Sequence, residues 1–277
     1  MEIIPISEIQ QAETGMHLRD LLSDAEFPRR KSSLHRADRR FEALDHLARV
    51  FAEPSNVVLQ KLVDIAVGFC GADSAGISLE ETNEAGERRF RWIAIAGTFS
   101  KYLNGTTPRF FSPCGTCLDS GRPQLYRVTK PYYDFLGVEA EEITDGMLIP
   151  WVSDDIRGTI WAISHQPEEV FDIEDYKLLN SLADFASIAV RHRYQEESLR
   201  KREIARASAV RANQLAHQIN NPLQSLTNSL YLASQGGHAT QSYVAQASHE
   251  LRALSELVAQ LLNMSDANDW LSRRQTP

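Results

Sequence analysis

A single histidine inside a helical segment is the residue of this sequence whose surroundings most suggest chemistry. It is His217, within LAHQINNPLQSL at residues 215–226, and Asn221 follows it by about one helical turn. An unprotonated imidazole is a good nucleophile near neutral pH. Pro222 lacks a backbone N–H and clashes with the carbonyl of Gln218, so it bends a helix at that point. The segment therefore places a nucleophile beside a bend.

A helical wheel divides this segment into two faces. At about 100° per residue, five apolar side chains fall within a sector of roughly 80°. They are Leu215, Ile219, Leu223, Leu226 and Leu230. The opposite side carries His217, Asn221, Gln224 and Asn228. We therefore expect His217 to point into solvent.

The sequence around this segment predicts a pair of helices. From Ile188 to Leu232 there is no glycine and one proline, which indicates one long helix or two nearly collinear ones. SQGGHAT then ends the helix, and a second helix is expected from about Gln241 to Met264. Six of its apolar residues step by three and four, as in a heptad seam: Val244, Ala247, Leu251, Leu254, Val258 and Leu261. Two helices cannot close a core alone, so we expect a homodimer that forms a four-helix bundle.

Upstream of these helices, strand-like runs dominate the sequence. Five runs rich in β-branched and aromatic residues lie between about 74 and 165: AGISLEE, RRFRWIAIAG, PQLYRV, DGMLIPWV and GTIWAISH. The first two and the last two are typical of hairpins. Helical patterns flank the runs; one ends near Gly71 and the other begins after Asp172, its expected N-cap. The pattern predicts an α+β domain at residues 41–195, with an antiparallel sheet and flanking helices.

The helical pair resembles a known signalling module. HQINNPL matches six of the seven letters of the motif His-Glu-Ile-Asn-Asn-Pro-Leu, and residues 198–264 resemble the dimerisation and phosphoacceptor hairpin of histidine kinases. The resemblance implies that His217 accepts a phosphoryl group. It also implies that Asn221 orients water for phosphatase action on a response-regulator receiver domain, with the kink at Pro222 beside them.

Two departures from that family limit the expected activity. Gln218 replaces the family's Glu, and an amide cannot accept the imidazole proton as a carboxylate does. Only 15 residues follow Leu262, and the chain has no glycine-rich phosphate-binding loop. We therefore expect no ATPase domain and no autokinase activity in cis; a kinase acting in trans, or reversed transfer from a receiver, would phosphorylate His217.

The α+β domain resembles a GAF domain over about residues 41–192. FCGADSAGISLEE, TPRFFSPCGTCLDSGRPQLY, MLIPW and GTIWAISH carry this resemblance. It implies a sheet of about six strands, helices on one face and a cavity for a small molecule, but it does not identify the ligand. Six residues are candidates to contact that ligand, with a plain core role as the alternative: Trp92, Cys114, Cys117, Tyr126, Trp151 and Trp161.

The CGTC segment leaves several interpretations open. A zinc site would need more ligands than Cys114 and Cys117 supply, so no metal is expected. A thiol switch is an alternative, since Cys114 lies just ahead of a predicted short helix that would stabilise a thiolate. Buried small side chains are the simplest interpretation. A cysteine-based reductase, as in GAF proteins that reduce methionine sulfoxide, is a further hypothesis.

Composition bounds the partners and the location. The net charge of −8 argues against nucleic-acid binding, and no run of 18 apolar residues indicates a membrane span. Three cysteines fit a reducing compartment, so a cytoplasmic protein is expected. The basic run PRRKSSLHRADRR is expected to be solvated. The predicted organisation is a polar segment (1–40), the GAF sensor (41–195), the helical hairpin (196–265) and a tail (266–277).

These patterns together predict a cytoplasmic two-component signalling protein. A GAF domain would sense a ligand, and His217 would take part in phosphoryl transfer or phosphatase action. The alternative is a non-catalytic dimeric adaptor that senses a ligand and binds a kinase or a response regulator.

Overall fold

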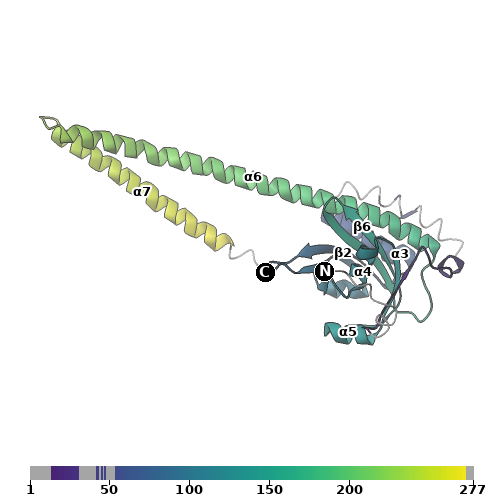
Figure 1. Ribbon diagram of the computed structural model, residues 1–277. Coiled ribbons are helices and arrows are strands. Elements are labelled where there is room, and N and C mark those ends of the chain that lie inside the picture. The colour runs from purple at the N-terminus through teal and green to yellow at the C-terminus, as the bar shows by residue number, and fades with distance from the viewer. Residues whose placement is uncertain (1–13, 31–41, 44, 46, 48–53, 273–277) are drawn as a thin grey trace. The chain divides into compact units, whose positions relative to one another are not determined.

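The computed structural model describes residues 14–30, 42–43, 45, 47 and 54–272. The chain divides into two compact units, with the boundary between Glu197 and Ser198. The first unit is a β-sheet flanked by helices, and the second is a pair of helices (Figure 1). In the part of the chain that is described, every helix is too short or too polar to cross a lipid bilayer.

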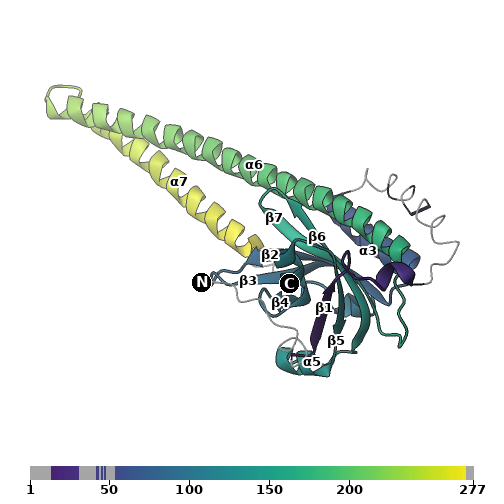
Figure 2. The same cartoon turned by 45° about the vertical axis from the view of Figure 1, so that its right-hand side comes forward.

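One antiparallel sheet organises the first unit (Figure 2). Its seven strands run in the order β1-β5-β6-β7-β2-β3-β4. They are β1 (Met16–Asp20), β2 (Ser74–Thr82), β3 (Arg88–Gly97), β4 (Thr106–Pro108), β5 (Gln124–Val128), β6 (Ile143–Ser153) and β7 (Ile156–Ser164). The five strands expected from the sequence are all present, and β2–β3 and β6–β7 are the two expected hairpins.

The helices of the first unit are short, apart from the two that cover the sheet. They are η1 (Phe27–Arg29), α3 (Ser55–Cys70), η2 (Thr98–Tyr102), α4 (Pro113–Ser120), α5 (Lys130–Leu136) and the start of α6 (Ile173–Ser234). Helix α3 ends as predicted at Gly71, whose φ of 67° is costly for other residues. Most of the helical pattern expected between 41 and 53 lies outside the described residues.

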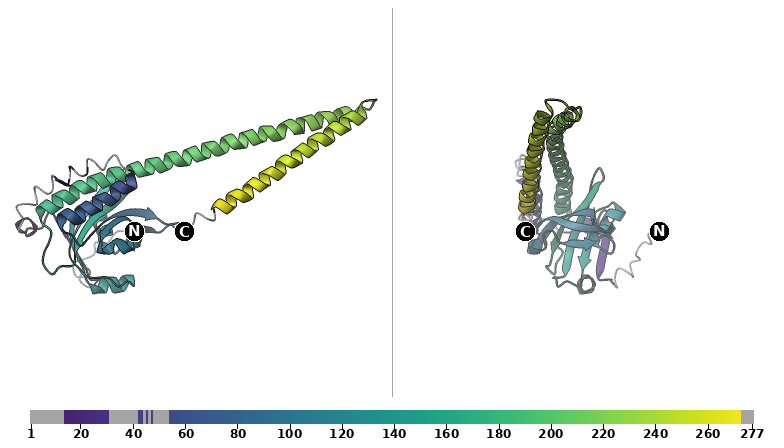
Figure 3. Two further views of the ribbon diagram at one scale, coloured as in Figure 1. Left: turned by 180° about the vertical axis from the view of Figure 1, so that it is seen from behind. Right: turned by 90° about the vertical axis from the view of Figure 1, so that its left-hand side faces the viewer.

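The two faces of the sheet have different partners. Helix α3 and the first part of α6 lie side by side over one face (Figure 3). There Leu62 of α3 and Ala186 of α6 are fully buried in the same cluster as Ile160 of β7. The next residue of β7, Trp161, belongs to a second cluster on the opposite face, because side chains alternate along a strand. That second face carries no long helix and holds the candidate site.

Glycines opposite the large aromatic residues shape this second face. Gly76 pairs with Trp161, and Gly146 pairs with Tyr126. A Cβ on Gly76 would lie 2.2 Å from the Trp161 ring, and a Cβ on Gly146 would lie 2.5 Å from the Tyr126 ring. Each ring therefore lies flat across its partner strand because the glycine has no side chain there.

The N-terminal segment adds a strand that the sequence analysis did not predict. Strand β1 pairs with β5 at the edge of the sheet, with Met16 opposite Val128. A few residues later, the buried guanidinium of Arg30 contacts Asp145 of β6 at 3.0 Å and donates to the carbonyl of Phe171 at 2.9 Å. Asp145 also accepts the backbone N–H groups of Val170 and Phe171. This network ties the N-terminal segment and β6 to the start of α6.

Helix α6 begins where the sequence predicts. Asp172 caps it, since one carboxylate oxygen accepts the N–H groups of Glu174 and Asp175 at 2.8 and 3.1 Å. The helix continues without interruption through Pro222 to Ser234. Helix α7 (Thr240–Ser272) follows after a short glycine-containing connection.

In the second unit, one hydrogen bond joins α6 and α7, and one small residue of each helix is buried. Ser229 of α6 and Ala247 of α7 are buried, and the Ser225 hydroxyl donates to Glu250 at 2.9 Å. Several large apolar side chains of both helices remain exposed in the single chain: Leu223, Leu230, Tyr231, Leu232, Val244, Leu251 and Val258. The pair thus leaves much of its apolar surface uncovered within one chain.

Removing the buried cation of the Arg30 network should destabilise the first unit. Arg30→Met leaves the buried Asp145 without its charge partner, and the free energy of unfolding is expected to fall by about 3 kcal/mol. Urea denaturation of the full chain measures this. Arg127→Met is the matched control, because Arg127 pairs with Glu169 in a half-exposed position and should change stability by less than about 1 kcal/mol. Equal effects of the two variants would contradict this account of the network.

Candidate functional site

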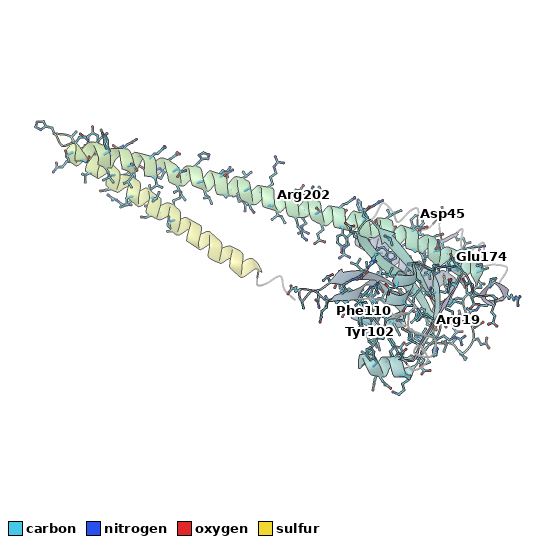
Figure 4. All side chains as sticks on the ribbon, in the orientation of Figure 1. Arg19, Asp45, Tyr102, Phe110, Glu174 and Arg202 are labelled. Atoms are coloured by element: carbon cyan, nitrogen blue, oxygen red, sulfur yellow. The ribbon has the colours of Figure 1, made fainter. Side chains whose placement is uncertain are left out.

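A cavity of about 1040 Å³ lies on the face of the sheet that α3 and α6 leave uncovered. Its walls come from β3, β4, β5, β6 and β7, together with η2, α4 and α5. Aromatic rings make up much of the lining: Trp92, Phe99, Tyr102, Phe110, Tyr126, Tyr132, Tyr133 and Trp161. Figure 4 labels two of these residues, Tyr102 at the end of η2 and Phe110 just after β4. The volume is at the upper end of the range for small-molecule sites.

Four of the aromatic rings form a connected set of contacts along one wall. Trp92 meets Trp161 edge to face with centroids 5.9 Å apart, and Phe99 lies 6.3 Å from Trp161. Tyr102 touches both Trp92 and Phe99, at 6.2 and 5.5 Å. The Trp161 indole N–H donates to the Ser78 hydroxyl at 3.1 Å, which fixes the ring. The wall is therefore a preformed aromatic surface.

The structure separates the six residues that the sequence analysis proposed as ligand contacts. Trp92, Cys114, Tyr126 and Trp161 line the cavity. Cys117 is buried beside it, and Trp151 packs across Gly158 in the cluster under the helices. Whether any of the six contacts a ligand stays a prediction.

The two cysteines of α4 are buried thiols. The Cys114 sulfur lies 3.6 Å from the Ser78 hydroxyl, and the Cys117 thiol donates to the carbonyls of Arg122 and Leu148 at 3.5 and 3.8 Å. Burial raises the pKa of both thiols, so neither is a thiolate at neutral pH. Among the described residues, no group of three His, Cys, Asp or Glu side chains is placed to hold a metal. These environments favour a packing role and disfavour a thiol switch or a cysteine nucleophile.

Burial also keeps the phenols of the cavity neutral. The pKa values of Tyr126, Tyr132 and Tyr133 are all raised, with burial as the largest cause. Tyr132 donates its hydroxyl proton to the carbonyl of Phe111 at 2.9 Å. The Tyr133 hydroxyl is buried and has no hydrogen-bond partner in the described part of the chain.

Charge is confined to one end of the cavity. Glu87, Arg88 and Arg89 line it at the tip of the β2–β3 hairpin. Arg88 pairs with Glu80, and Arg89 pairs with Glu81 at 2.8 Å. Burial disfavours the ionised form of Glu80, but hydrogen bonds from Arg157 and the charge of Arg109 outweigh it and lower the pKa of this carboxyl. Each of these two arginines therefore contacts a protein carboxylate, but Glu80 also pairs with Arg109 and Arg157, and Glu81 also pairs with Arg91, so positive charge is in excess at this end.

The second candidate site lies on α6. His217, Gln218 and Asn221 are exposed, and Pro222 is half-buried. Within the described residues, His217 has neither a hydrogen bond nor an ion pair to another side chain. The imidazole is thus open to solvent on the face of α6 that carries Asn221. The chemical roles assigned to these residues stay predictions.

Several residues of the cavity were missed by the sequence analysis. Phe99 and Tyr102 lie in η2, and Tyr132 and Tyr133 lie in α5, two short helices that were not predicted. Their signal was the aromatic content of PYYDF and TFSKY, each next to a strand. The glycines opposite Trp161 and Tyr126 become informative only when the strand register is known.

Comparison with protein families identifies the first unit. The family model described as GAF domain matches residues 52–191, which is just over half of the 277 residues. The chain belongs to the GAF domain family. GAF domains are sensor modules of signalling proteins, and the resemblance predicted from the sequence is confirmed for this unit.

Solved structures similar to this chain include other GAF domains. The GAF domain of a phosphoenolpyruvate-protein phosphotransferase from Coxiella burnetii is 15% identical, with a TM-score of 0.47, and covers 61% of this chain and 99% of its own. The corresponding domain from Acinetobacter is 13% identical, with a TM-score of 0.45 and coverages of 59% and 97%. The GAF domain of a protein described as a sensor histidine kinase from Pseudomonas syringae pv. tomato is 18% identical, with a TM-score of 0.40 and coverages of 60% and 94%. A search of curated proteins found no match.

The buried thiols and phenols predict a loss of stability at alkaline pH. In the unfolded chain the thiols ionise near pH 9.0 and the phenols near pH 10.0, whereas in the folded GAF domain these pKa values are higher. The unfolded state therefore releases protons first. The free energy of unfolding should be unaffected by these groups below about pH 8 and should fall above pH 9, by about 1.4 kcal/mol per pH unit for each ionising group.

Urea denaturation at pH 8 and pH 10.5 measures this loss. Cys117→Ala should have a smaller decrease in stability between the two pH values than the wild type, because it lacks one of the ionising groups. A decrease as large in Cys117→Ala as in the wild type would show that the Cys117 thiol does not contribute.

Proposed function

We propose that this protein is a two-component signalling protein in which the GAF cavity binds a small molecule and His217 exchanges a phosphoryl group with a response-regulator receiver domain. The observation that carries the proposal is the exposed imidazole of His217 on α6, within HQINNPL, which has no hydrogen bond or ion pair among the described residues. A receiver domain is bulky, so a phosphoacceptor must lie on an open face. An imidazole that is already free of partners can attack without first breaking an interaction.

Helix α6 supports a link between sensing and phosphoryl transfer. Its first residues, including Leu182 and Ala186, are buried against the sheet of the GAF domain, and the same helix continues to His217 and beyond. No loop interrupts α6 between Ala186 and His217. A change in the packing of its first turns therefore has a continuous helical path toward the phosphoacceptor.

The exposed apolar surface of the helical pair supports a homodimer. Leu230 of α6 and Leu251 of α7 are more than half exposed in the single chain, although both belong to apolar stripes. Burying such stripes against a second copy gives the four-helix bundle expected from the heptad spacing. Sedimentation velocity at micromolar concentration distinguishes this dimer from a monomer.

Gln218 supports a second candidate function, that of a dimeric adaptor that does not transfer phosphoryl groups. Its amide stands in the motif position where a carboxylate would accept the imidazole proton, and the side chain is exposed. An adaptor would bind a kinase or a response regulator in a ligand-dependent way. In that case His217→Ala would leave control of the partner unchanged.

Phosphoryl transfer to His217 is tested with receiver domains that carry labelled phosphate. The full chain is incubated with each member of a panel of phosphorylated receivers, and label on the chain is measured after acid and after alkali. Phosphohistidine is lost in acid and survives alkali. We expect alkali-stable label on the wild type and none on His217→Ala. His249→Ala removes another exposed helical histidine and should keep the label.

Two further variants separate the roles of the neighbouring residues. Gln218→Glu restores a general base and should increase labelling by a complete kinase in trans by about tenfold or more. Asn221→Ala should slow the loss of phosphate from the receiver without reducing the label on His217. Equal labelling of wild type and His217→Ala would exclude His217 as the phosphoacceptor and would leave the adaptor function as the remaining candidate.

A further inference from the structure

The charge distribution of the GAF cavity restricts its ligand. Glu87, Arg88 and Arg89 are the charged residues among those that line it, and all three lie at the tip of one hairpin. Both arginines are paired with carboxylates. Farther inside, the described lining consists of aromatic and aliphatic side chains with a few neutral polar groups. A phosphate or carboxylate buried there would lose its hydration without gaining a counter-charge, which is strongly unfavourable.

The aromatic side chains that line the cavity favour a ligand with planar aromatic rings. Trp92, Trp161, Phe99 and Tyr102 present a connected set of faces and edges, and Trp161 is held by its hydrogen bond to Ser78. Planar aromatic molecules stack on such faces or meet their edges with favourable geometry. A volume of about 1040 Å³ exceeds what a single ring fills. The cavity therefore suits a planar molecule of two or more rings.

The hydroxyl of Tyr133 supplies a polar contact inside the apolar wall. This residue lines the cavity, is more than nine-tenths buried, and its oxygen has no hydrogen-bond partner among the described residues. The neighbouring Tyr132 hydroxyl already donates to the carbonyl of Phe111, and the Tyr102 hydroxyl lies 3.3 Å from the carbonyl of Glu139. Because its pKa is raised, the Tyr133 phenol is neutral and can donate. A carbonyl on a ligand is a suitable acceptor.

We infer that the GAF cavity binds an uncharged, planar aromatic compound of at least two rings that carries a hydrogen-bond acceptor for Tyr133. This inference rests on the proposed sensing function, and it adds the chemical class of the ligand. It disfavours ligands that would place an anionic group in the interior of the cavity, away from the charged hairpin tip.

Two fluorescent probes that share an aromatic skeleton test the charge preference. N-phenyl-1-naphthylamine is neutral, and 8-anilino-1-naphthalenesulfonate adds a sulfonate to the same skeleton. The full chain should bind the neutral probe with one site per chain and at least tenfold more tightly than the sulfonate. Ile163→Trp places a larger side chain in the cavity wall and should abolish this binding, while Ile204→Trp on the exposed surface of α6 should not.

Each outcome of the probe experiment decides the inference. Tighter binding of the sulfonate, or equal binding of both, would overturn the ligand class and leave sensing in place. Binding of the neutral probe that survives Ile163→Trp would place it elsewhere and overturn the inference. Binding of neither probe would overturn the inference and remove ligand sensing from the proposed function. None of these outcomes affects phosphoryl transfer to His217, which is measured separately.

A second ligand pair tests the polar contact. Flavone has a carbonyl, whereas 2-phenylnaphthalene has a similar shape without a polar atom, and both compete with the neutral probe. Tyr133→Phe should lower the affinity for flavone by about fivefold and leave the affinity for 2-phenylnaphthalene unchanged. Tyr231→Phe, at an exposed position on α6, is the control for the loss of a phenol. An equal loss of affinity for both compounds would show that Tyr133 does not donate a hydrogen bond to the ligand.

Discussion

The structure of the sensor unit depends on the unequal covering of the two faces of one antiparallel sheet. Helices α3 and α6 bury one face through residues such as Leu62 and Ala186. The opposite face must therefore bury its own aromatic residues without a long helix above them. It does so because Gly76 and Gly146 let the rings of Trp161 and Tyr126 lie across neighbouring strands. Short elements close the remaining space, and the enclosed volume becomes a cavity rather than a core.

Because α6 covers one face of the sheet and also carries His217, it belongs to both the sensor core and the proposed phosphoacceptor site. Its start is fixed by the Asp172 cap and by the network of Arg30 and Asp145, and its first turns complete the core of the GAF domain. From Arg191 onward the helix is polar and exposed over most of its surface. The proposed phosphoacceptor lies on this second part. A helix that is anchored at one end and exposed at the other is a simple physical basis for the proposed signalling.

The sequence predicted the elements whose signals are local. Alternating β-branched and aromatic residues marked β2, β3, β5, β6 and β7, while Gly71 and Asp172 marked helix ends through their backbone and capping preferences. Strand β1 and the Arg30 network were not predicted, because pairing at a sheet edge depends on partners more than a hundred residues away. Trp151 and Trp161 looked equivalent in sequence, and only their register in β6 and β7 places them on opposite faces. The exposure of His217 followed from helical periodicity alone, whereas its chemistry needs a partner protein.

In the proposed function, occupancy of the GAF cavity is coupled to phosphoryl transfer at His217. Its most direct test is the rate of label transfer from a phosphorylated receiver to Ile163→Trp, in which an indole occupies part of the cavity, compared with Ile204→Trp and wild type. Circular dichroism must first show that all three chains have the same helical content. The account predicts a severalfold change in rate for Ile163→Trp and none for Ile204→Trp. Identical rates for all three proteins would contradict it.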